Sequence, residues 1–226
     1  MTRDRAASFL CIELLSDATF GRGEGTAGAV DTEAEHDETG LPLIGGKTVR
    51  GLLRDAWLSM HACFPDLGAA AERVLGRSKS LDERCRLRIG DALLPSPLRD
   101  TARVAVERAE WPLSPRAVLD GFSDIRYQTA EDRRTGAPMI TTLRSSRVIL
   151  RDFSFESRLG WMDGYRPVPD DLQVLALCAL ATRHGGLLRN RGRGHLRVTI
   201  DGDLDRTGQL AGSPLVANSP LGDPAR

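Results

Sequence analysis

Glycines and cationic side chains stand together at residues 45–54, GGKTVRGLLR, a combination that proteins use to hold phosphate. Gly45 and Gly46 come directly before a predicted helix, where unpaired backbone N–H groups and the helix dipole favour an anion. Lys47, Arg50 and Arg54 recur at helical spacing, so we expect them roughly on one helix face. The stretch predicts a phosphate contact, although an ordinary helix with a glycine-rich start and an exposed basic face explains it equally well.

The same stretch nearly matches the nucleotide-binding motif G-x-x-x-x-G-K-[ST]. Lys47 and Thr48 follow Gly46, but the first glycine of the motif would have to be residue 41, which is Leu41. The preceding sequence is acidic and polar, whereas a mononucleotide site follows a buried strand. A sugar–phosphate backbone passing over the helix start therefore fits better, and a nucleotide-binding protein remains an alternative.

A second basic stretch lies at residues 185–197, GGLLRNRGRGHLR. From Arg183 to Arg197 the sequence has five arginines, two histidines and no acid. Glycines let a phosphate chain approach the backbone closely, and arginines add bidentate hydrogen bonds. The stretch favours polyanion binding over a helix end followed by a solvated loop. Its candidate ligands are Arg189, Arg191, Gly192, Arg193 and Gly194.

Asp31 closes a glycine-rich loop that continues into the acidic run DTEAEHDE. An aspartate that faces a phosphate chain can hold a divalent cation or orient a ribose 2′-hydroxyl. Taken alone, the segment favours a solvated acidic loop over such a site.

Composition indicates a soluble globular chain of 226 residues with zero net charge, 41% hydrophobic and 27% charged. The four cysteines form no C-x-x-C pair, so neither a zinc knuckle nor a redox motif is indicated. No apolar run approaches the length of about 20 residues that crosses a bilayer. The N-terminal residues lack the pattern of a signal peptide, so we expect a cytoplasmic protein without a membrane partner.

Hydrophobic periodicity predicts an α+β fold. Strands are expected at 8–15, 85–94, 145–161 and 194–202, helices at 48–64, 68–76, about 98–109 and 170–184, a protruding hairpin or loop at 127–143, and a disordered tail from 206. The order of the main elements, strand, helix, strand, strand, helix, strand, is that of a ferredoxin-like or RRM-like βαββαβ unit with large insertions.

Together the segments resemble the RAMP superfamily of CRISPR effector proteins, and within it the backbone subunit of type III complexes. The resemblance rests on the glycine loop that ends at Asp31, on D-x-x-G-L-P-x-I-x-G-x-x-x-x-G-x-L-R at residues 37–54, and on G-G-x-x-x-x-R-G-x-G at 185–194. The motif-bearing parts cover about residues 8–60, 85–94, 124–160 and 170–202.

The resemblance implies a single RRM-like domain over 1–205, with a thumb insertion at about 124–146 and a disordered tail at 206–226. It implies that Gly45, Gly46 and the cationic residues already named follow the phosphates of a guide RNA. The thumb string EDRRTGAPMITTL adds Arg133 and Arg134 to the RNA-binding candidates. The thumb of the family separates guide from target and flips out a nucleotide at intervals.

Gly28-Ala29-Val30-Asp31 matches the family string G-A-[IV]-D, in which the aspartate is needed for metal-dependent cleavage of target RNA. The resemblance therefore implies that Asp31 is catalytic and a metal ligand, with Mg²⁺ or Mn²⁺ as the cofactor. It implies guide RNA, complementary target RNA, copies of the chain itself and other effector subunits as partners. Two alternatives remain open: a non-catalytic guide-RNA-binding subunit, and a metal-independent ribonuclease that processes repeat RNA.

Overall fold

The computed structural model describes residues 7–23, 25, 30–77, 85–107, 110–139, 141–162 and 164–212. In chain order the elements are β1 (Phe9–Leu14), β2 (Leu43–Ile44), α1 (Gly46–Met60), α2 (Gly68–Leu75), β3 (Leu87–Leu93), α3 (Ser96–Glu107), α4 (Pro115–Phe122), β4 (Ser123–Gln128), β5 (Arg144–Ile149), β6 (Ser154–Trp161), α5 (Pro169–Ala181), β7 (Leu196–Ile200) and α6 (Leu204–Leu210), with short 3-10 helices at His61–Cys63, Pro65–Leu67 and Arg189–Arg191.

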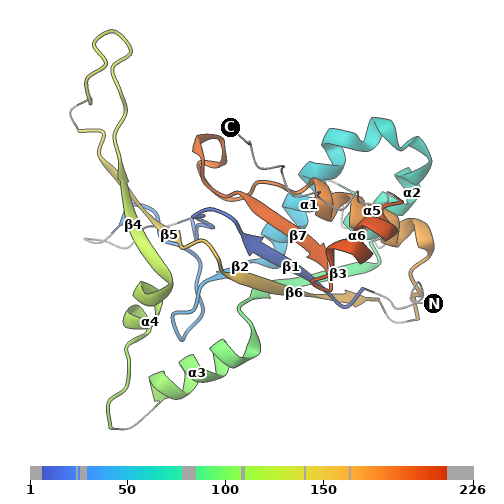
Figure 1. The fold of residues 1–226 in the computed structure, drawn as a ribbon, viewed down its shortest axis with the longest axis horizontal. Helices are drawn as coiled ribbons and strands as arrows, with labels where there is room; N and C mark the ends of the chain where they lie inside the picture. The colour runs from blue at the N-terminus through green and yellow to red at the C-terminus, as the bar shows by residue number, and fades with distance from the viewer. Residues whose placement is uncertain are drawn as a thin grey trace, which may run out of the picture.

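A five-stranded sheet in the order β2-β3-β6-β1-β7 forms the centre of the molecule (Figure 1). β1 pairs antiparallel with both β6 and β7, and β3 pairs antiparallel with β6. Without the two-residue strand β2, the chain order is β1, α1, β3, β6, α5, β7, and the sheet order is that of a ferredoxin-like fold. The predicted α+β class and βαββαβ order are therefore confirmed.

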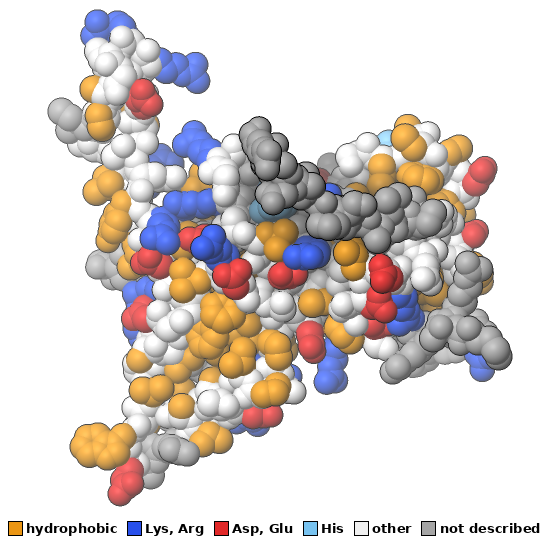
Figure 2. Space-filling model, in the orientation of Figure 1, with side chains coloured by type: hydrophobic (Ala, Val, Ile, Leu, Met, Phe, Trp, Pro, Cys, Tyr) orange, Lys and Arg blue, Asp and Glu red, His pale blue; other side chains and the backbone are white. Residues whose placement is uncertain are grey.

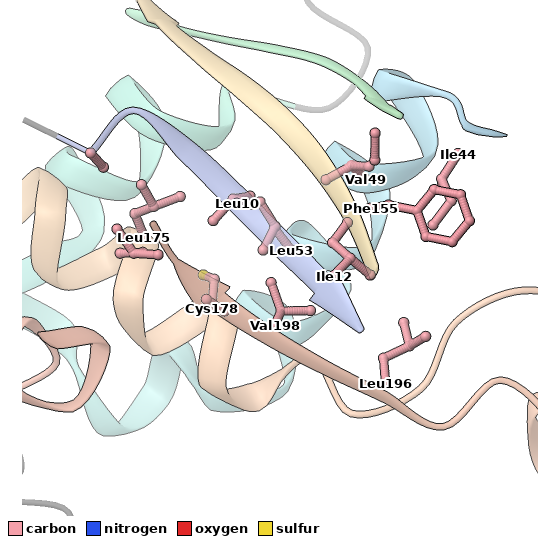
Figure 3. Packing of buried hydrophobic residues seen from close by; sticks show 14 of the residues in the cluster. Leu10, Ile12, Ile44, Val49, Leu53, Phe155, Leu175, Cys178, Leu196 and Val198 are labelled. Atoms are coloured by element: carbon pink, nitrogen blue, oxygen red, sulfur yellow. The ribbon is translucent and has the colours of Figure 1, made fainter. Parts of the chain in front are cut away.

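The core lies between the sheet and the helices α1 and α5. Alternation along β1 directs Leu10, Ile12 and Leu14 inward, and each is at most 1% exposed. Figure 3 shows Leu10 and Ile12 among side chains of α1 and α5, including Leu53 and Cys178. Because α1 and α5 pack on one face, they hold the loops at the ends of β1 and β7 in fixed positions.

The segment between β3 and β6 is the large insertion of the fold. It contains α3, α4 and the antiparallel hairpin of β4 and β5, which extends away from the main sheet (Figure 1). The predicted protruding hairpin is therefore present, with its turn at Thr135 and Gly136. The strand predicted at 145–161 is instead two strands in different sheets, because the chain turns at Arg151 and Asp152, where Asp152 has φ +70°.

A buried ion pair fixes the base of this hairpin. The Nε atom of Arg147 lies 2.7 Å from Oε1 of Glu33, and the two residues are 1% and 3% exposed. The Nη1 atom of Arg147 also donates to Asp120 at 2.8 Å and to the hydroxyl of Ser123 at 2.7 Å. One guanidinium group therefore joins the segment after the glycine loop, helix α4 and strand β5.

The predicted disordered tail is wrong at its start, because helix α6 occupies Leu204–Leu210 and crosses the expected boundary at 205. Asp203 caps the helix by accepting from the backbone N–H of Arg206 at 2.8 Å, and Thr207 and Ala211 are buried. The hydrophobic pattern does not indicate this helix, because α6 packs against α5 through small residues and its sequence is otherwise polar. Residues 213–226 lie outside the described residues.

Helix α4 is a further helix that the sequence analysis did not predict. Pro115 is tolerated at the first helical position, and the hydroxyl of Ser114 caps the helix by accepting from Ala117 at 3.1 Å. Among the described residues, no helix is long and apolar enough to cross a membrane.

Replacing the buried guanidinium should destabilise the fold strongly. We expect Arg147→Met to lower the free energy of unfolding by about 3–5 kcal/mol, because buried Glu33 would lose its 2.7 Å contact and keep the longer one to Arg116 at 3.4 Å. Urea denaturation followed by circular dichroism measures this change. Arg144→Met, an exposed arginine on the same strand, is the matched control and should stay within about 0.5 kcal/mol of the parent. A loss below about 1 kcal/mol for Arg147→Met would show that this ion pair does not hold the hairpin in place.

Candidate nucleic-acid interface

The basic loop between α5 and β7 is closed at its base by backbone hydrogen bonds. Leu196 N–H donates to the carbonyl of Arg183 and Gly185 N–H to that of Gly194, both at 2.8 Å. Gly194 has φ +69°, and a Cβ atom there would lie 1.9 Å from the carbonyl oxygen of Gly185. Only glycine fits where these two backbone segments approach so closely, so Gly194 determines the shape of the loop. Its N–H donates to the carbonyl of Asp17 at 2.9 Å and is not open to phosphate.

The arginines of this loop have three different environments. Arg189 pairs with Asp55 of α1 at 3.2 Å, and Arg193 donates to the hydroxyl of Ser146 at 3.1 Å. Arg191 is exposed beside Gly192, which is exposed and has φ +77°. The loop therefore offers Arg191 and Gly192 to solvent and attaches Arg189 and Arg193 to neighbouring elements.

Asp31 is exposed and is held by one residue of β5. The backbone N–H of Ser145 donates to Oδ2 of Asp31 at 2.7 Å and its hydroxyl donates to the same oxygen at 3.0 Å. In return the Asp31 N–H donates to the Ser145 hydroxyl oxygen at 3.0 Å. Gly28 and Ala29 of the sequence motif lie outside the described residues, and Val30 is buried. The carboxylate is thus positioned, with its Oδ1 atom directed to no donor within the part of the chain that is described.

These hydrogen bonds lower the pKa of Asp31 below its ordinary value of 3.8. The backbone N–H of Ser145 is the largest cause, followed by its hydroxyl, and the charge of Arg144 adds to the effect. Each stabilises the charged form, so the carboxylate stays ionised to lower pH than a free aspartate does.

Strand β5 brings Asp31 and the basic loop to one place. Ser145 holds Asp31, and the next residue, Ser146, accepts the hydrogen bond of Arg193. Asp31 accepts from the backbone N–H and hydroxyl of Ser145, and Arg193 donates to the hydroxyl of the adjacent Ser146. Residues far apart in the sequence therefore flank the base of the hairpin.

The glycines before α1 do not offer unpaired N–H groups, so that expectation is wrong. Gly45 N–H donates to Oε2 of Glu35 at 3.3 Å, and Gly46 N–H donates to Oδ1 of Asp91 at 2.7 Å. A Cβ atom on Gly46 would lie 2.5 Å from the carbonyl oxygen of Ile89, so glycine permits close packing against β3. The carboxylates stand where phosphate oxygens would bind, which removes support for a nucleotide site.

Arg50 and Arg54 also differ from expectation, because both are half-buried and bind the chain itself. Arg50 donates to the carbonyls of Val74 at 3.2 Å and Leu87 at 2.6 Å, and Arg54 donates to the carbonyl of Gly76 at 3.1 Å. They attach α1 to the end of α2 and to β3. The structure therefore does not bring them to the basic loop, while Lys47 remains exposed on the first turn of α1.

Arg133 and Arg134 lie at the tip of the hairpin, and both are exposed. Figure 2 shows Lys and Arg side chains at this tip, far from the main sheet. Asp132 shapes the turn by accepting from the backbone N–H of Arg134 at 2.8 Å. The turn leaves both guanidinium groups exposed at the end of the extension.

Two further arginines line a hollow beside the basic loop, and the sequence analysis missed them. Arg126 of β4 and Arg151 after β5 share this hollow with Gly192 and Arg193. Arg126 pairs with Asp17 at 3.1 Å, which reduces its free charge. No motif marks these residues, since only the folded hairpin places them near the loop.

The described residues contain no cluster of three or more His, Cys, Asp or Glu side chains that could hold a metal ion. Asp31 offers one carboxylate, and its Oδ2 atom already accepts from Ser145. Mg²⁺ is commonly held by one or two carboxylates together with water and substrate phosphate. Asp31 therefore fits a metal that RNA helps to bind, and does not form a protein-only metal site.

Comparison with known proteins identifies a family and a fold. The model of the RAMP superfamily matches residues 11–197. A cryo-EM structure of the type III-B Cmr-beta complex bound to cognate target RNA contains a chain with TM-score 0.61 and 15% sequence identity, covering 87% of this chain and 97% of that one. The same complex in its apo state gives TM-score 0.61 and 15% identity, covering 87% and 98%. No curated protein matches.

Removing the hydroxyl of Ser145 should raise the pKa of Asp31 toward 3.8. The backbone N–H remains, so the pKa should stay below that value in Ser145→Ala. NMR titration of the Asp31 carboxyl measures the change, and Ser146→Ala is the matched control. The stability that this carboxylate contributes is fully present above the pKa of Asp31 in the unfolded chain and is lost as pH falls through the pKa of Asp31 in the folded chain. Because the folded-state pKa should be higher in Ser145→Ala, the variant should lose this contribution at a higher pH. An unchanged pKa would contradict the hydrogen bond.

Proposed function

The chain belongs to the RAMP superfamily, and on that basis we propose that it binds a guide RNA within a type III CRISPR effector complex and cleaves complementary target RNA. The observation that carries the proposal is the meeting of three features at β5. Asp31 is held by Ser145, the basic loop reaches Ser146 through Arg193, and the hairpin that carries Arg133 and Arg134 starts from the same strand.

Guide RNA would contact the exposed part of the basic loop through Arg191, Gly192 and Arg193. Contacts to phosphate position an RNA without reading its sequence, which base pairing to the target would supply. Lys47 adds a charge at the first turn of α1. Gly45, Gly46, Arg50 and Arg54 act within the chain, so the proposed RNA path follows the loop and the hairpin base.

Cleavage would proceed by attack of a target 2′-hydroxyl on the adjacent phosphate. The attacking oxygen gives up its proton to solvent water and forms a bond to phosphorus as the bond to the 5′-oxygen breaks. Water protonates the departing 5′-oxygen, which leaves a 2′,3′-cyclic phosphate and a 5′-hydroxyl. Asp31 is ionised, exposed and oriented by Ser145, so it is suited to accept a hydrogen bond from the attacking hydroxyl. The hairpin would separate guide from target at this point, which frees one nucleotide from A-form geometry.

Asp31 would be the protein residue that holds Mg²⁺ or Mn²⁺, and such an ion would supply charge stabilisation for the phosphate under attack. The chain itself contributes the carboxylate and the serine that orients it. Water and RNA would complete the coordination, since no described cluster of protein ligands surrounds Asp31.

The assignment to a type III complex rests on the shape of the chain and on its motifs. The cryo-EM relatives belong to the type III-B Cmr-beta complex, one of them bound to cognate target RNA. By extension, we propose copies of this chain and other effector subunits as protein partners, and guide and target RNA as nucleic-acid partners.

A non-catalytic RNA-binding subunit is the second candidate. The reciprocal hydrogen bonds of Asp31 and Ser145 favour it, because they give the carboxylate a structural task at the hairpin base. In that case Asp31 fixes the loop and takes no part in cleavage.

RNA binding by the basic loop should depend on salt and on Arg191. We expect Arg191→Gln to weaken binding of a single-stranded RNA and to reduce the slope of log K against log salt by about 0.7, because one phosphate contact is lost. Fluorescence anisotropy at several salt concentrations measures both changes. Arg88→Gln, an exposed arginine of β3 near the opposite edge of the sheet, is the control. Equal slopes for parent and Arg191→Gln would remove the loop from the RNA path.

Cleavage by the assembled complex should depend on Asp31. Asp31→Asn keeps the size of the side chain but removes its charge, and we expect cleavage of a complementary RNA to slow by about 10²–10⁴-fold. Gel analysis of labelled target measures the rate, with Glu38→Gln as an exposed acid from the same segment for control. Unchanged fragments with Asp31→Asn would favour the non-catalytic subunit, and full activity in EDTA would favour the metal-independent ribonuclease.

A further inference from the structure

A polar hollow lies on the α1 side of the basic loop, apart from Asp31 and the hairpin. It is lined by Asp55 and Ser59 of α1, by Thr182 and Arg183 at the end of α5, and by His184 and Arg189 of the loop. Leu52 and Ala56 form its apolar part. The phosphate contacts proposed above do not use this hollow, so its chemistry requires a separate explanation.

Two histidines stack at the edge of this hollow. The backbone ladder that closes the loop pairs His184 with His195, and their rings lie 5.1 Å apart at an angle of 18°. His195 is half-buried, and its backbone N–H donates to the hydroxyl of Ser16 at 2.9 Å, which holds the backbone of this residue in place. His184 is exposed and lines the hollow. The fold therefore stacks the exposed His184 ring on His195 and places it in the lining of the hollow, where another ring could stack on it.

The charges around the ring select among possible ligands. Asp55 would repel a phosphate, although it is paired with Arg189 at 3.2 Å. A metal site is not indicated, because the described residues hold no cluster of three His, Cys, Asp or Glu ligands. The lining of the hollow matches the chemistry of a nucleobase. Asp55 can accept and the guanidinium groups can donate hydrogen bonds at the base edge, while the His184 ring can stack on the base face.

We propose that this hollow binds an unpaired base of the bound RNA, which stacks on His184 while its polar edge faces Asp55 and Arg189. The inference rests on the proposed RNA-binding function and adds a base contact to it. Stacking tolerates any base, because every base has a π face. The site is therefore expected to favour RNA with bases over a bare sugar–phosphate chain, without selecting a sequence.

The position of the hollow suits an RNA that follows the loop. Arg189 faces the hollow and Arg191 is exposed two residues further along the same 3-10 helix, Arg189–Arg191. An RNA whose phosphates contact Arg191 would pass the rim of the hollow, and one rotated nucleotide would reach the ring. The cost of unstacking a single base, about a few kcal/mol, is offset by stacking on the histidine.

The test compares two single-stranded oligonucleotides of equal length and charge, one with bases and one with a stable abasic sugar at every position. Binding to the full chain is measured by competition against a labelled RNA, for the parent, His184→Ala, His184→Phe and the control His61→Ala. His61 is an exposed histidine after α1 whose Nδ1 is bonded to the Leu58 carbonyl. Circular dichroism melting shows whether each variant is folded.

We expect the parent to prefer the strand with bases by about 5-fold to 100-fold, the range that base–aromatic stacking gives. His184→Ala should lose most of this preference while its affinity for the abasic strand is unchanged. His184→Phe and His61→Ala should keep the preference, which a merely structural role for His184 would not produce.

An equal preference in the parent and in a folded His184→Ala would overturn the inference while RNA binding itself stands. Binding of neither strand by the parent would instead contradict the proposed function. If His184→Ala does not fold, His184→Phe still decides, because a phenyl ring that lost the preference would contradict stacking.

Discussion

The buried ion pair of Arg147 and Glu33 is the constraint on which the site depends. Both groups are almost fully buried, and a buried charge without its partner is costly, so the pair permits one alignment of the segment after the glycine loop with β5. In this alignment Thr32 forms a parallel β-bridge with Ser146, and Asp31 accepts a hydrogen bond from Ser145. A slip by one residue would turn Asp31 to the other face of the segment. The geometry of an exposed carboxylate therefore follows from an interaction that is hidden from solvent.

The same strand passes this constraint to the rest of the interface. Ser146 accepts from Arg193, so the basic loop is attached to the strand that holds Asp31. The loop is in turn closed by the tight crossing at Gly194, which admits no side chain. The hairpin, the aspartate and the loop come from distant parts of the chain, yet each is fixed to β5 or to its neighbour by a short contact. An RNA that touches all three would meet a surface already formed before it binds.

The sequence could predict the elements with a clear hydrophobic pattern and the motifs that lie within one continuous stretch of the chain. The apolar run that contains Leu10 and Ile12 predicted the first strand, and the order of elements along the chain predicted the fold class. The glycine–arginine spacing predicted a loop at 185–194, which the structure attaches through Arg193 to the residue after Ser145. It could not predict what depends on tertiary contact. Arg147 lies in a run that reads as a strand, and its burial becomes visible only when Glu33 is placed beside it. Helix α6 has a polar sequence whose few buried residues match α5 only after folding.

The largest difference between expectation and structure concerns α1, and it changes which residues the proposed RNA path can use. Periodicity placed Lys47, Arg50 and Arg54 roughly on one face, but periodicity cannot say whether that face meets solvent or protein. Arg50 and Arg54 meet backbone carbonyls of α2 and β3, while Leu52 and Asp55 line the hollow on the other side of the helix. Carboxylates close the start of α1 to phosphate. In the proposed function, the helix would contact RNA through the side that faces the basic loop, where Asp55, Arg189 and His184 line one hollow, and the motif at its start serves the packing of the fold.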